Sequence, residues 1–332
     1  MRIHRVLTPL VALSLLIACG TDDSADAPSS PETTAPSGDA GGPTEPEAPS
    51  ADGPVSAVDS TGTTIELAAP AERIACLTEP CVDALVELGL TPVAASPTGV
   101  ASLPEFYGDA ADEIPTIGGS FFEPAIEDVV ASDPDLVIGL QGVHEPIRDA
   151  LGDIPLYIVG IESTDQALDF LVDVGTLTGH SDDAARAAEE FSTELASAIA
   201  DTDADLSVAV VFSGAFGFNI NTTDNSVTAQ MLSQIVDYPF ADADADTSAG
   251  FAQFSVEQLL DADPDFVFVN TIADDGGQGE SSSVVMADDA VWGRLTAVAE
   301  DRVVDTRTPL WQYGRGTRSL SIILDEFRAA ID

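Results

Sequence analysis

The middle of the chain carries the longest helical pattern of hydrophobic positions. Ser163 and Gln166 form a capping-box signature, apolar residues follow at helical spacing, and Gly179 ends the pattern. A second amphipathic run, residues 181–200, contains neither glycine nor proline. Twenty helical residues span about 30 Å, which is long enough to join two lobes rather than two neighbouring strands. The pattern therefore predicts an interlobe helical strut over residues 165–201.

The two flanks of this strut repeat one pattern. Residues 125–139 and 255–269 each show a short amphipathic helix, an Asp-Pro-Asp turn and a continuous apolar run typical of a buried parallel strand. In each copy a glutamate, Glu127 or Glu257, stands seven residues before the proline. The shared proline and the shared glutamate offset favour a structural pseudo-repeat over chance.

Strands alternate with helices along the rest of the chain. A hairpin is predicted over residues 55–67 with its turn at 59–62, and a helix over 81–88. Further strands are predicted at residues 73–77, 92–95, 115–117, 135–139 and 155–159 before the strut, and at 206–212, 265–270 and 302–305 after it. Such alternation predicts parallel sheets, whose ligands collect at the carboxyl ends of the strands. The expected fold class is therefore α/β, with two Rossmann-like lobes of parallel sheet bridged by a single long helix.

The first residues read as a bacterial export signal. An apolar run over residues 6–17 is too short to span a bilayer, and residues 16–19 read as a lipobox. We expect residues 1–18 to be a lipoprotein signal peptide and Cys19 to carry the lipid. The alternative is an ordinary secretory signal with an incidental cysteine.

The residues that follow are polar and contain no basic side chain. Residues 19–54 are rich in Ser, Pro, Thr, Gly and Ala, and such a composition buries too little apolar surface to fold. They are therefore predicted to form a lipidated disordered tether. The folded part is expected to divide into an N-terminal α/β lobe, residues 55–164, the helical strut, and a C-terminal α/β lobe, residues 202–332.

The chain has a formal net charge of −47, and its eleven basic residues are all arginine. Repulsion disfavours nucleic acid and anionic membrane surfaces as partners. Six arginines lie in the last 39 residues: Arg294, Arg302, Arg307, Arg315, Arg318 and Arg328. This skew marks either a site for a negatively charged ligand or local charge neutralisation on surface helices. The acidic, lysine-free composition fits a salty habitat or a high-GC genome, and the sequence does not separate the two.

The three cysteines form a simple set. If Cys19 carries lipid, Cys76 and Cys81 remain as a pair in an oxidising compartment. We expect a disulfide between them that fastens the turn from the strand at 73–77 to the following helix. A metal site there is disfavoured because no histidine or further cysteine is nearby.

Several of these segments together resemble a known family. Residues 58–62, 70–74 and 301–305, with the two helix-Pro-strand segments, resemble the class III substrate-binding proteins of ABC importers, which serve ferric siderophores, cobalamin or haem. The resemblance covers nearly all of residues 55–331. It implies two lobes bridged by one long helix, with limited hinge motion when ligand binds.

The resemblance also implies roles for two glutamates. In that family one glutamate on each lobe engages arginines of the two permease subunits, and Glu127 and Glu257 match those positions. Helical periodicity leaves both side chains exposed. The alternative is a pair of ordinary solvated carboxylates near helix N-termini, where negative charge is mildly favourable.

Candidate ligand residues are those just past the predicted strand ends. They are Ser120, Phe121, Phe122, Gln141, His144, Phe216, Phe218, Trp311, Tyr313 and Arg315. Aromatic walls with one or two arginines suit a bulky, anionic metal chelate. Pro309, Gly314 and Gly316 indicate an irregular loop around the last three candidates, whereas Phe216 and Phe218 are equally well explained as core.

The motifs of common enzymes are missing from the sequence. It shows no nucleophile elbow, no phosphate-binding glycine loop and no Cys-His pair, so we expect a binding protein rather than an enzyme. A receptor for free zinc or manganese is disfavoured because His144 and His180 are the two histidines beyond the signal peptide.

The expected protein is a monomeric, extracytoplasmic receptor anchored to the cell membrane by lipid. We expect it to capture a ferric siderophore, whose iron is coordinated by the chelator, and to pass it to an ABC permease dimer with its ATPase. No resident cofactor or metal is expected. The alternatives are a cobalamin receptor, a haem receptor with Tyr313 or His144 as axial ligand, and a surface lipoprotein with no transport role.

Overall fold

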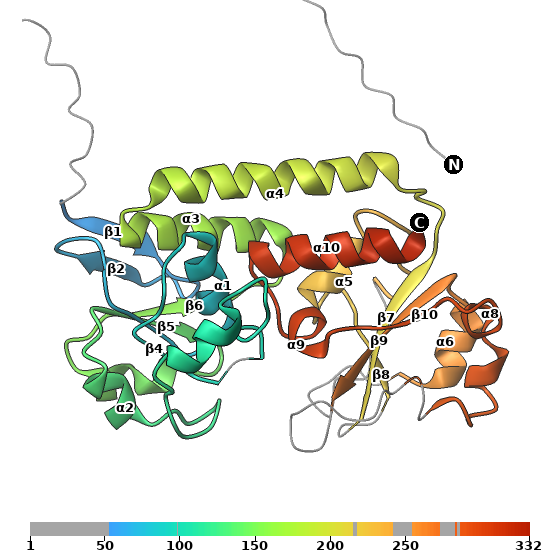
Figure 1. The fold of residues 1–332 in the computed structure, drawn as a ribbon, viewed down its shortest axis with the longest axis horizontal. Helices are drawn as coiled ribbons and strands as arrows, with labels where there is room; N and C mark the ends of the chain where they lie inside the picture. Colours follow the sequence, from blue (N-terminus) through green and yellow to red (C-terminus); the bar gives the residue numbers. More distant parts are fainter. Residues whose placement is uncertain (1–52, 98, 215–217, 242–253, 273–282, 284–285) are drawn as a thin grey trace, which may run out of the picture. The chain divides into compact units, whose positions relative to one another are not determined.

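The computed structural model describes residues 53–97, 99–214, 218–241, 254–272, 283 and 286–332, and it contains two four-stranded sheets within that range (Figure 1). The first sheet has the order β4-β3-β5-β6 and is parallel throughout. Its strands are β3 (Ile74–Cys76), β4 (Ala94–Ala95), β5 (Leu136–Leu140) and β6 (Leu156–Val159). An antiparallel hairpin of β1 (Val55–Val58) and β2 (Thr64–Leu67) precedes it, as predicted.

The second sheet has the order β10-β9-β7-β8. Its strands are β7 (Val208–Gly214), β8 (Asn219–Ile220), β9 (Phe266–Ile272) and β10 (Val303–Asp305). All neighbours are parallel except β8, which runs antiparallel to β7. One parallel sheet and one sheet that is parallel except for β8 confirm the expected α/β class with two lobes.

Helices cover both sheets. The longer ones are α1 (Glu79–Glu87), α3 (Thr164–Thr178), α4 (Ser181–Asp201) and α10 (Thr317–Ile331). The shorter ones are η1 (Gly108–Glu113), α2 (Ile126–Ala131), η2 (Glu145–Leu151), α5 (Val227–Leu232), α6 (Val256–Ala262), η3 (Trp292–Arg294), α8 (Thr296–Ala299) and α9 (Thr308–Trp311). None of the helices in the described residues is both long and apolar enough to cross a membrane.

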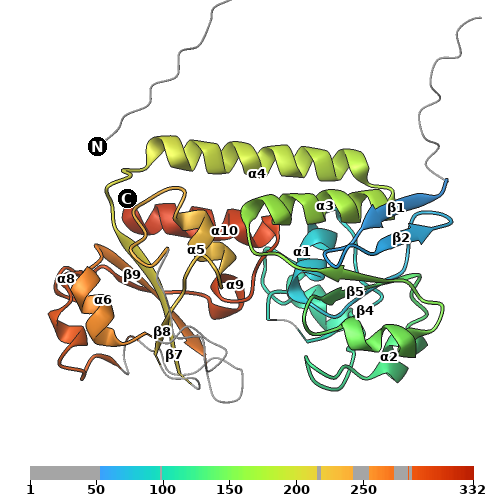
Figure 2. The same cartoon turned by 180° about the vertical axis from the view of Figure 1, so that it is seen from behind.

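The predicted strut is a helical hairpin rather than one rod. Helix α3 ends at Gly179, whose φ of 76° is left-handed, and α4 then runs back along α3 and on past both sheets (Figures 1 and 2). Gly175 allows this tight reversal because a Cβ there would overlap the side chain of Ala184. The bridging element is therefore α4 alone, whose 21 residues span about 31 Å.

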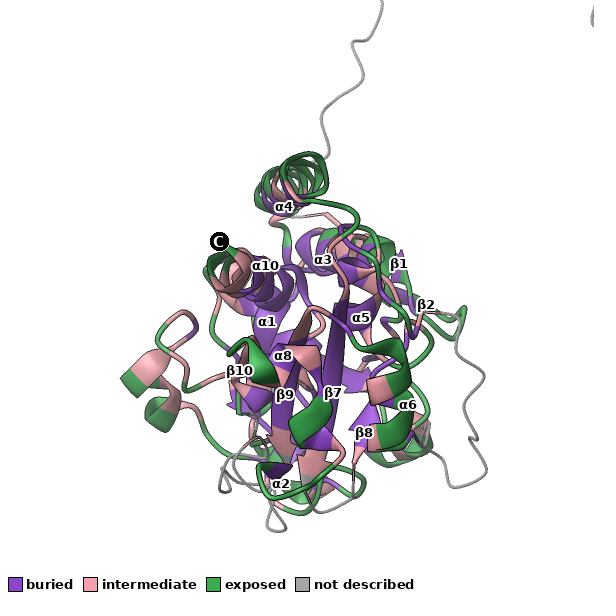
Figure 3. Ribbon diagram, turned by 90° about the vertical axis from the view of Figure 1, so that its right-hand side faces the viewer, coloured by how far each residue is buried: buried purple, intermediate pink, exposed green. Residues whose placement is uncertain are grey.

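One hydrophobic core extends under the helices from the first lobe to the second. It includes Leu85 of α1, Phe191 of α4, Phe268 of β9 and Phe327 of α10. Strands β7 and β9 are buried, whereas the outer side of α4 is exposed (Figure 3). Helix α10 packs against α1, α3 and α4, so it joins the two lobes beneath the bridging helix.

The predicted pseudo-repeat is present in the structure. Asp133 after α2 and Asp263 at the end of α6 both take left-handed backbone, with φ of 50° and 43°. Beyond each following proline, an aspartate side chain accepts backbone N–H groups from the neighbouring strand's start: Asp135 from Glu72 and Arg73, and Asp265 from Ser207. Each copy thus fastens its strand to the parallel strand beside it.

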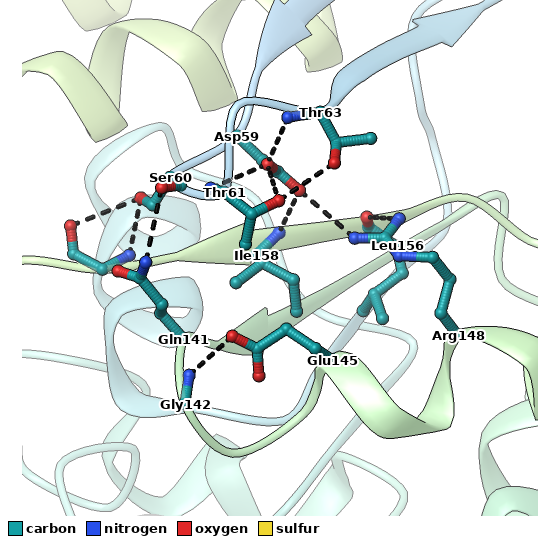
Figure 4. A network of polar contacts seen from close by, with 11 residues as sticks. Asp59, Ser60, Thr61, Thr63, Gln141, Gly142, Glu145, Arg148, Leu156 and Ile158 are labelled. Atoms are coloured by element: carbon teal, nitrogen blue, oxygen red, sulfur yellow. Dashed lines mark hydrogen bonds and ion pairs between the residues drawn. The ribbon is translucent and has the colours of Figure 1, made fainter.

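A buried carboxylate fixes the β1-β2 hairpin to the first sheet (Figure 4). Asp59 is 3% exposed and accepts hydrogen bonds from the backbone N–H groups of Thr61 and Thr63, both at 2.9 Å. It also accepts from the N–H of Ile158 in β6 and from the guanidinium of Arg148, both at 3.3 Å. The hairpin turn is therefore part of the sheet's edge.

Some predictions were wrong or lie outside the described residues. Residues 115–117 form only an isolated parallel bridge, between Thr116 and Ala95, instead of a full strand. The lipidation site Cys19 and the candidate ligand residue Phe216 both lie outside the described residues.

The structure joins Cys76 and Cys81 in a disulfide with a Cα–Cα distance of 5.4 Å. We expect reduction to lower the free energy of unfolding by about 2 kcal/mol, because a crosslink over so short a loop removes a modest amount of denatured-state entropy. Denaturant unfolding with and without reductant measures this. The Cys76→Ala, Cys81→Ala double variant should be insensitive to reductant, and two alkylatable thiols in the unreduced, denatured mature protein would contradict the crosslink.

Candidate functional site

The carboxyl ends of the first sheet's strands meet at one edge. Glu79 follows β3, Gln141 follows β5 and Ile161 follows β6. Ligands of parallel α/β sheets bind at this edge because the loops that leave the strands diverge there. Residues from the second lobe reach the same edge through the segment between α9 and α10.

Arg315 makes the contact between the lobes at this edge. Its guanidinium donates to the carbonyl oxygen of Ile161 at 3.3 Å. Burial lowers the pKa of Arg315, while the nearby carboxylates of Glu79 and Glu162 act in the opposite direction. Burial raises the pKa of Glu79, and Arg315 opposes that shift. We call Arg315, Glu79, Glu162 and Tyr313 the interlobe polar group.

Tyr313 belongs to this group because Glu79 influences it electrostatically. Its side chain is 40% exposed, and burial of the remainder, followed by the charge of Glu79, raises the pKa of its hydroxyl. The phenol is therefore neutral at physiological pH and available as a hydrogen-bond donor. Tyr313 and Arg315 therefore both interact with Glu79, and their contact with a ligand stays a prediction.

Within the described part of the chain, four of the six arginines in the last 39 residues form ion pairs, which supports local charge neutralisation as the reason for their clustering there. Arg302 pairs with Glu300, Arg307 with Glu105 and Glu326, Arg318 with Glu87, and Arg328 with Asp201. Arg315 instead donates to a carbonyl at the edge of the sheet. Of these five arginines, Arg315 is therefore the best placed to meet a ligand at that edge.

Phe121 and Phe122 form an exposed aromatic pair, which we call the aromatic tip. They occupy the turn between Ser120 and Glu123, whose backbone groups exchange hydrogen bonds of 3.0 and 3.2 Å. The two rings stand edge to face with centroids 5.3 Å apart, and Phe122 is 72% exposed. Gly119 at φ 87° is required here because a Cβ would collide with the carbonyl of Glu123. The tip is therefore a defined turn that presents apolar rings to solvent.

The expectation that His144 contacts ligand was wrong. Its side chain is fully buried, and both ring nitrogens have protein partners. Nδ1 accepts the N–H of Leu140 at 2.9 Å, and Nε2 lies 2.7 Å from the carbonyl oxygen of Phe121. The same contacts exclude His144 as an axial ligand for haem.

The expectation that Trp311 lines a ligand loop was also wrong. It ends helix α9, is 1% exposed and stacks on Phe268 with ring centroids 4.9 Å apart. Its indole N–H donates to Glu326 at 2.6 Å. Pro309 was read as a loop signal, but proline is well tolerated in the first turn of a helix. Phe218 is half-buried and packs against the core, which agrees with the core alternative.

Sequence reasoning missed a buried carboxylate between the lobes. Asp83 of α1 is 1% exposed and accepts the backbone N–H groups of Arg318 and Ser319 at 3.0 and 2.9 Å. These N–H groups belong to the first turn of α10, so Asp83 caps a helix that begins at Thr317 in the second lobe. The Arg318 guanidinium also donates to the carbonyl of Glu105. We call this set of contacts the interlobe latch.

A second polar network joins β8, β9 and the segment after α9 in the second lobe. The side-chain oxygen of Gln312 accepts from the amides of Asn221 and Asn270 at 3.4 and 3.3 Å. The hydroxyl of Thr306 donates to Asn270 at 2.6 Å. Both asparagines are buried. Asn270 lies inside β9 and Asn221 directly follows β8, so their recognisable signal was a polar residue within or just after an apolar strand.

A cavity of about 580 Å³ opens beside the β1-β2 hairpin. Its lining includes Ser60, Gln141, Tyr157, Glu162 and Asp169. Among the described candidate ligand residues, Gln141 is the one that lines it. The hydroxyl of Ser60 accepts the N–H of Gly160 after β6, and the amide of Gln141 donates to the carbonyl oxygen of Ser60 (Figure 4). The cavity is lined by the carboxylates of Glu162, Asp169 and Asp173, and neither phenylalanine of the aromatic tip lines it.

The two pseudo-repeat glutamates occupy equivalent places. Glu127 and Glu257 are both exposed and are each the second residue of a short helix, α2 or α6. Their equivalence follows from the repeated local geometry described above.

With this geometry in view, residues 74–310 match the family described as periplasmic binding protein. The chain belongs to this family. It is 27% identical over 260 residues to a cobalamin-binding protein of Halobacterium salinarum, an alignment that covers 77% of this chain and 68% of the relative.

Solved structures show that this periplasmic binding protein has the class III fold. The petrobactin-binding protein YclQ of Bacillus subtilis superposes with a TM-score of 0.72 at 16% identity, covering 84% of this chain and 99% of that one. The periplasmic catecholate-siderophore binding protein VctP of Vibrio cholerae gives 0.67 at 16% identity, covering 83% and 99%. The bridging helix α4 and the paired parallel sheets are thus features of the fold.

Proposed function

We propose that this periplasmic binding protein is an extracytoplasmic receptor that captures a ferric siderophore and delivers it to an ABC importer. Family membership and the siderophore-binding neighbours support a bulky chelate as cargo. We also propose that lipid on Cys19 anchors the receptor, with residues 19–54 as its tether, and that it acts as a monomer on a permease dimer with its ATPase.

The observation that carries the cargo proposal is the aromatic tip. An exposed apolar patch is more informative than a single exposed apolar residue, and two adjacent aromatic rings fixed in one turn form a candidate surface for stacking on a ligand. Phe122 offers a ring face for stacking, and Phe121 supports it edge to face. Arg315, partly buried among carboxylates, supplies a charge-assisted hydrogen-bond donor for an oxygen-rich chelate.

Cobalamin is a second candidate cargo. The relative in Halobacterium salinarum is a cobalamin-binding protein, and a corrin also offers a flat face for an aromatic side chain. Haem keeps Tyr313 as its remaining candidate axial ligand, since His144 is buried and fully bonded.

We expect a panel of ligands to separate these readings. Native mass spectrometry of the mature protein with ferric hydroxamate, catecholate and carboxylate siderophores, cyanocobalamin and haemin should show one-to-one binding of a ferric siderophore. Binding of cyanocobalamin alone would replace the siderophore with cobalamin, and binding of haemin alone would favour haem. A protein that binds no member of the panel would contradict the receptor proposal.

We expect Phe122→Ala and Arg315→Ala each to weaken binding of the best panel ligand at least about tenfold, since residues at the centre of a binding site contribute about 1.4 kcal/mol or more. Titration calorimetry measures the loss. Ile199→Ala and Arg186→Ala are matched controls, because Ile199 is an exposed apolar residue and Arg186 an exposed arginine, both on α4. Wild-type affinity in both test variants would contradict the site.

A further inference from the structure

The aromatic tip is fastened to the sheet by one side chain. His144 follows β5 and is fully buried, and its Nε2 lies 2.7 Å from the carbonyl oxygen of Phe121. The imidazole also stands edge to face with the ring of Phe121, with centroids 5.4 Å apart. Gly139 in β5 makes room for this arrangement, because a Cβ there would lie 2.7 Å from that of His144.

The hydrogen bonds of His144 fix which ring nitrogen carries the proton. The backbone N–H of Leu140 points at Nδ1 from 2.9 Å, so Nδ1 must accept and cannot carry a hydrogen. The single proton of the neutral ring therefore sits on Nε2 and is donated to Phe121. A protonated ring has a donor at both nitrogens: its Nε2–H can still donate to Phe121, but its Nδ1–H would oppose the N–H of Leu140. Release of the tip therefore requires the charged ring to turn away from Leu140, and this movement takes Nε2 away from the carbonyl oxygen of Phe121.

We propose that His144 is a positioning residue that holds the aromatic tip in place through the carbonyl of Phe121, and that protonation of its Nδ1 releases the tip. The role of the tip in cargo binding rests on the proposed function, whereas the hold on the tip does not. The observed contacts are made by the neutral ring, so the structure is that of the held state.

The surroundings of His144 favour its neutral form. Burial lowers the pKa of His144, and the hydrogen bond to Phe121 and the carboxylate of Glu145 oppose that shift. Glu145, on η2, is itself engaged by the N–H of Gly142 at 2.7 Å. On the tip loop Glu123 is exposed, and on α2 Asp128 accepts the N–H of Gly118 at 2.9 Å. Strand β5 contributes no charged side chain.

These shifts set the direction of the pH dependence. Because the folded state disfavours the charged ring, the tip is held at neutral pH and is released as the pH falls below the ordinary histidine value of about 6.5. The same shift means that the folded state loses stability as the pH falls through this range, since the unfolded chain binds the proton more readily.

The chain offers a clean reporter for the tip. Its two tryptophans, Trp292 and Trp311, are 2% and 1% exposed, so a third tryptophan introduced as Phe122→Trp is the one that reaches solvent in the described structure. Acrylamide quenching and fluorescence anisotropy of this reporter follow the tip. Imidazole ¹⁵N NMR of the mature protein follows His144 directly, and His180→Gln assigns the two histidine signals.

We expect the NMR spectrum to show the Nε2–H tautomer of His144 at neutral pH. In Phe122→Trp, anisotropy should be lost and quenching should rise over the pH range in which the His144 signal titrates. Adding His144→Leu should give the released values at every pH. Adding His144→Gln should restore the held values, because an amide N–H can replace Nε2–H, and should abolish the pH step, because an amide does not titrate. His180→Gln should leave the step intact.

Reporter signals that do not change as His144 titrates would overturn the proposal, and so would an unchanged pH step in His144→Gln. If His144→Leu does not fold, the NMR titration and the reporter measurements on His144→Gln still test whether His144 holds the tip. The cargo arm repeats ligand binding across the same pH range with the best ferric siderophore of the panel. A protein that binds no panel ligand defeats the proposed function and leaves the reporter result standing.

Discussion

Replacing Asp83 with alanine is expected to lower the free energy of unfolding by roughly 2–4 kcal/mol, because it leaves two buried N–H groups at a helix N-terminus without an acceptor. The two groups belong to Arg318 and Ser319, and Asp83 approaches them from the other lobe. Equilibrium unfolding in denaturant, monitored by circular dichroism, measures the loss. The variant should also unfold over a broader transition, since the latch couples the lobes.

A matched control is available on the surface. Asp289 also accepts two backbone N–H groups, those of Val291 and Trp292, but its side chain is exposed. Water can replace an exposed acceptor, so Asp289→Ala should cost about 1 kcal/mol or less. Equal losses at the two positions would show that burial between the lobes adds nothing to the cap.

The pH dependence gives a second check on the latch. Burial raises the pKa of Asp83 to about 6, against the pull of the Ser319 and Arg318 hydrogen bonds. An unfolded aspartate titrates near 3.9, so between about 4 and about 6 the folded protein holds more protons than the unfolded chain. The contribution of Asp83 to stability therefore falls as the pH rises through this window and is constant above it. Asp83→Asn should lack the step, and a constant difference from wild type across the window would contradict the assignment.

The latch also explains why one glycine is required. A Cβ at Gly316 would overlap the carboxylate of Asp83, so only glycine lets α10 start this close to α1. The cap, the contact of Arg318 with Glu105 and the pair of Arg307 with Glu105 all join the first lobe to the segment around α9 and α10. The lobes are therefore linked by polar contacts beneath α4 as well as by α4 itself.

Features set by neighbours in the sequence were predictable. The cap of α3 formed as expected, with the Ser163 side chain accepting the N–H of Gln166. The hairpin at residues 55–67 and the two helix-Pro-strand segments also formed, because turn chemistry and periodicity act within a few residues. These local rules were sufficient for the fold class and for the boundaries of most strands.

Features set by distant partners were not predictable. Trp311 is core because Phe268, 43 residues earlier, offers a ring to stack on, and His144 is buried because the Phe121 carbonyl completes its hydrogen bonds. Asp83 was not singled out in the sequence, because the N–H groups that it accepts lie on α10. A composition rule treats an aromatic or a histidine near a strand end as a ligand residue, whereas the tertiary fold decides which of them reaches solvent.

The reversal between α3 and α4 depends on both neighbouring and distant residues. Gly179 was correctly identified as the end of α3, and its left-handed φ confirms the reason. The direction in which α4 leaves depends on the contact of Gly175 with Ala184 across the turn, which no local pattern encodes. The sequence therefore predicted both helices but not their hairpin arrangement.

The largest functional effect is expected from reversing the two pseudo-repeat charges together. We propose that Glu127 and Glu257 dock this periplasmic binding protein onto its permease, one glutamate for each half of a two-fold partner. Both are exposed and stand at the same position of equivalent helices, so they present a matched pair of charges. In Glu127→Arg with Glu257→Arg, ligand-dependent ATPase stimulation and uptake should fall at least about tenfold, because opposing like charges costs several kcal/mol.

The same double variant should fold and bind cargo normally. Exposed charges contribute little to folding, so the free energy of unfolding should stay within about 0.5 kcal/mol of wild type, apart from a small loss at the two helix N-termini. Glu113→Arg with Glu189→Arg is a matched control, because both side chains are exposed and the change in net charge is identical. If the control variant loses uptake equally, net charge rather than docking is responsible, and if the test variant retains uptake, these glutamates do not dock the permease. A single reversal should give an intermediate loss, since each half of a two-fold permease would still meet one correct charge on the other lobe.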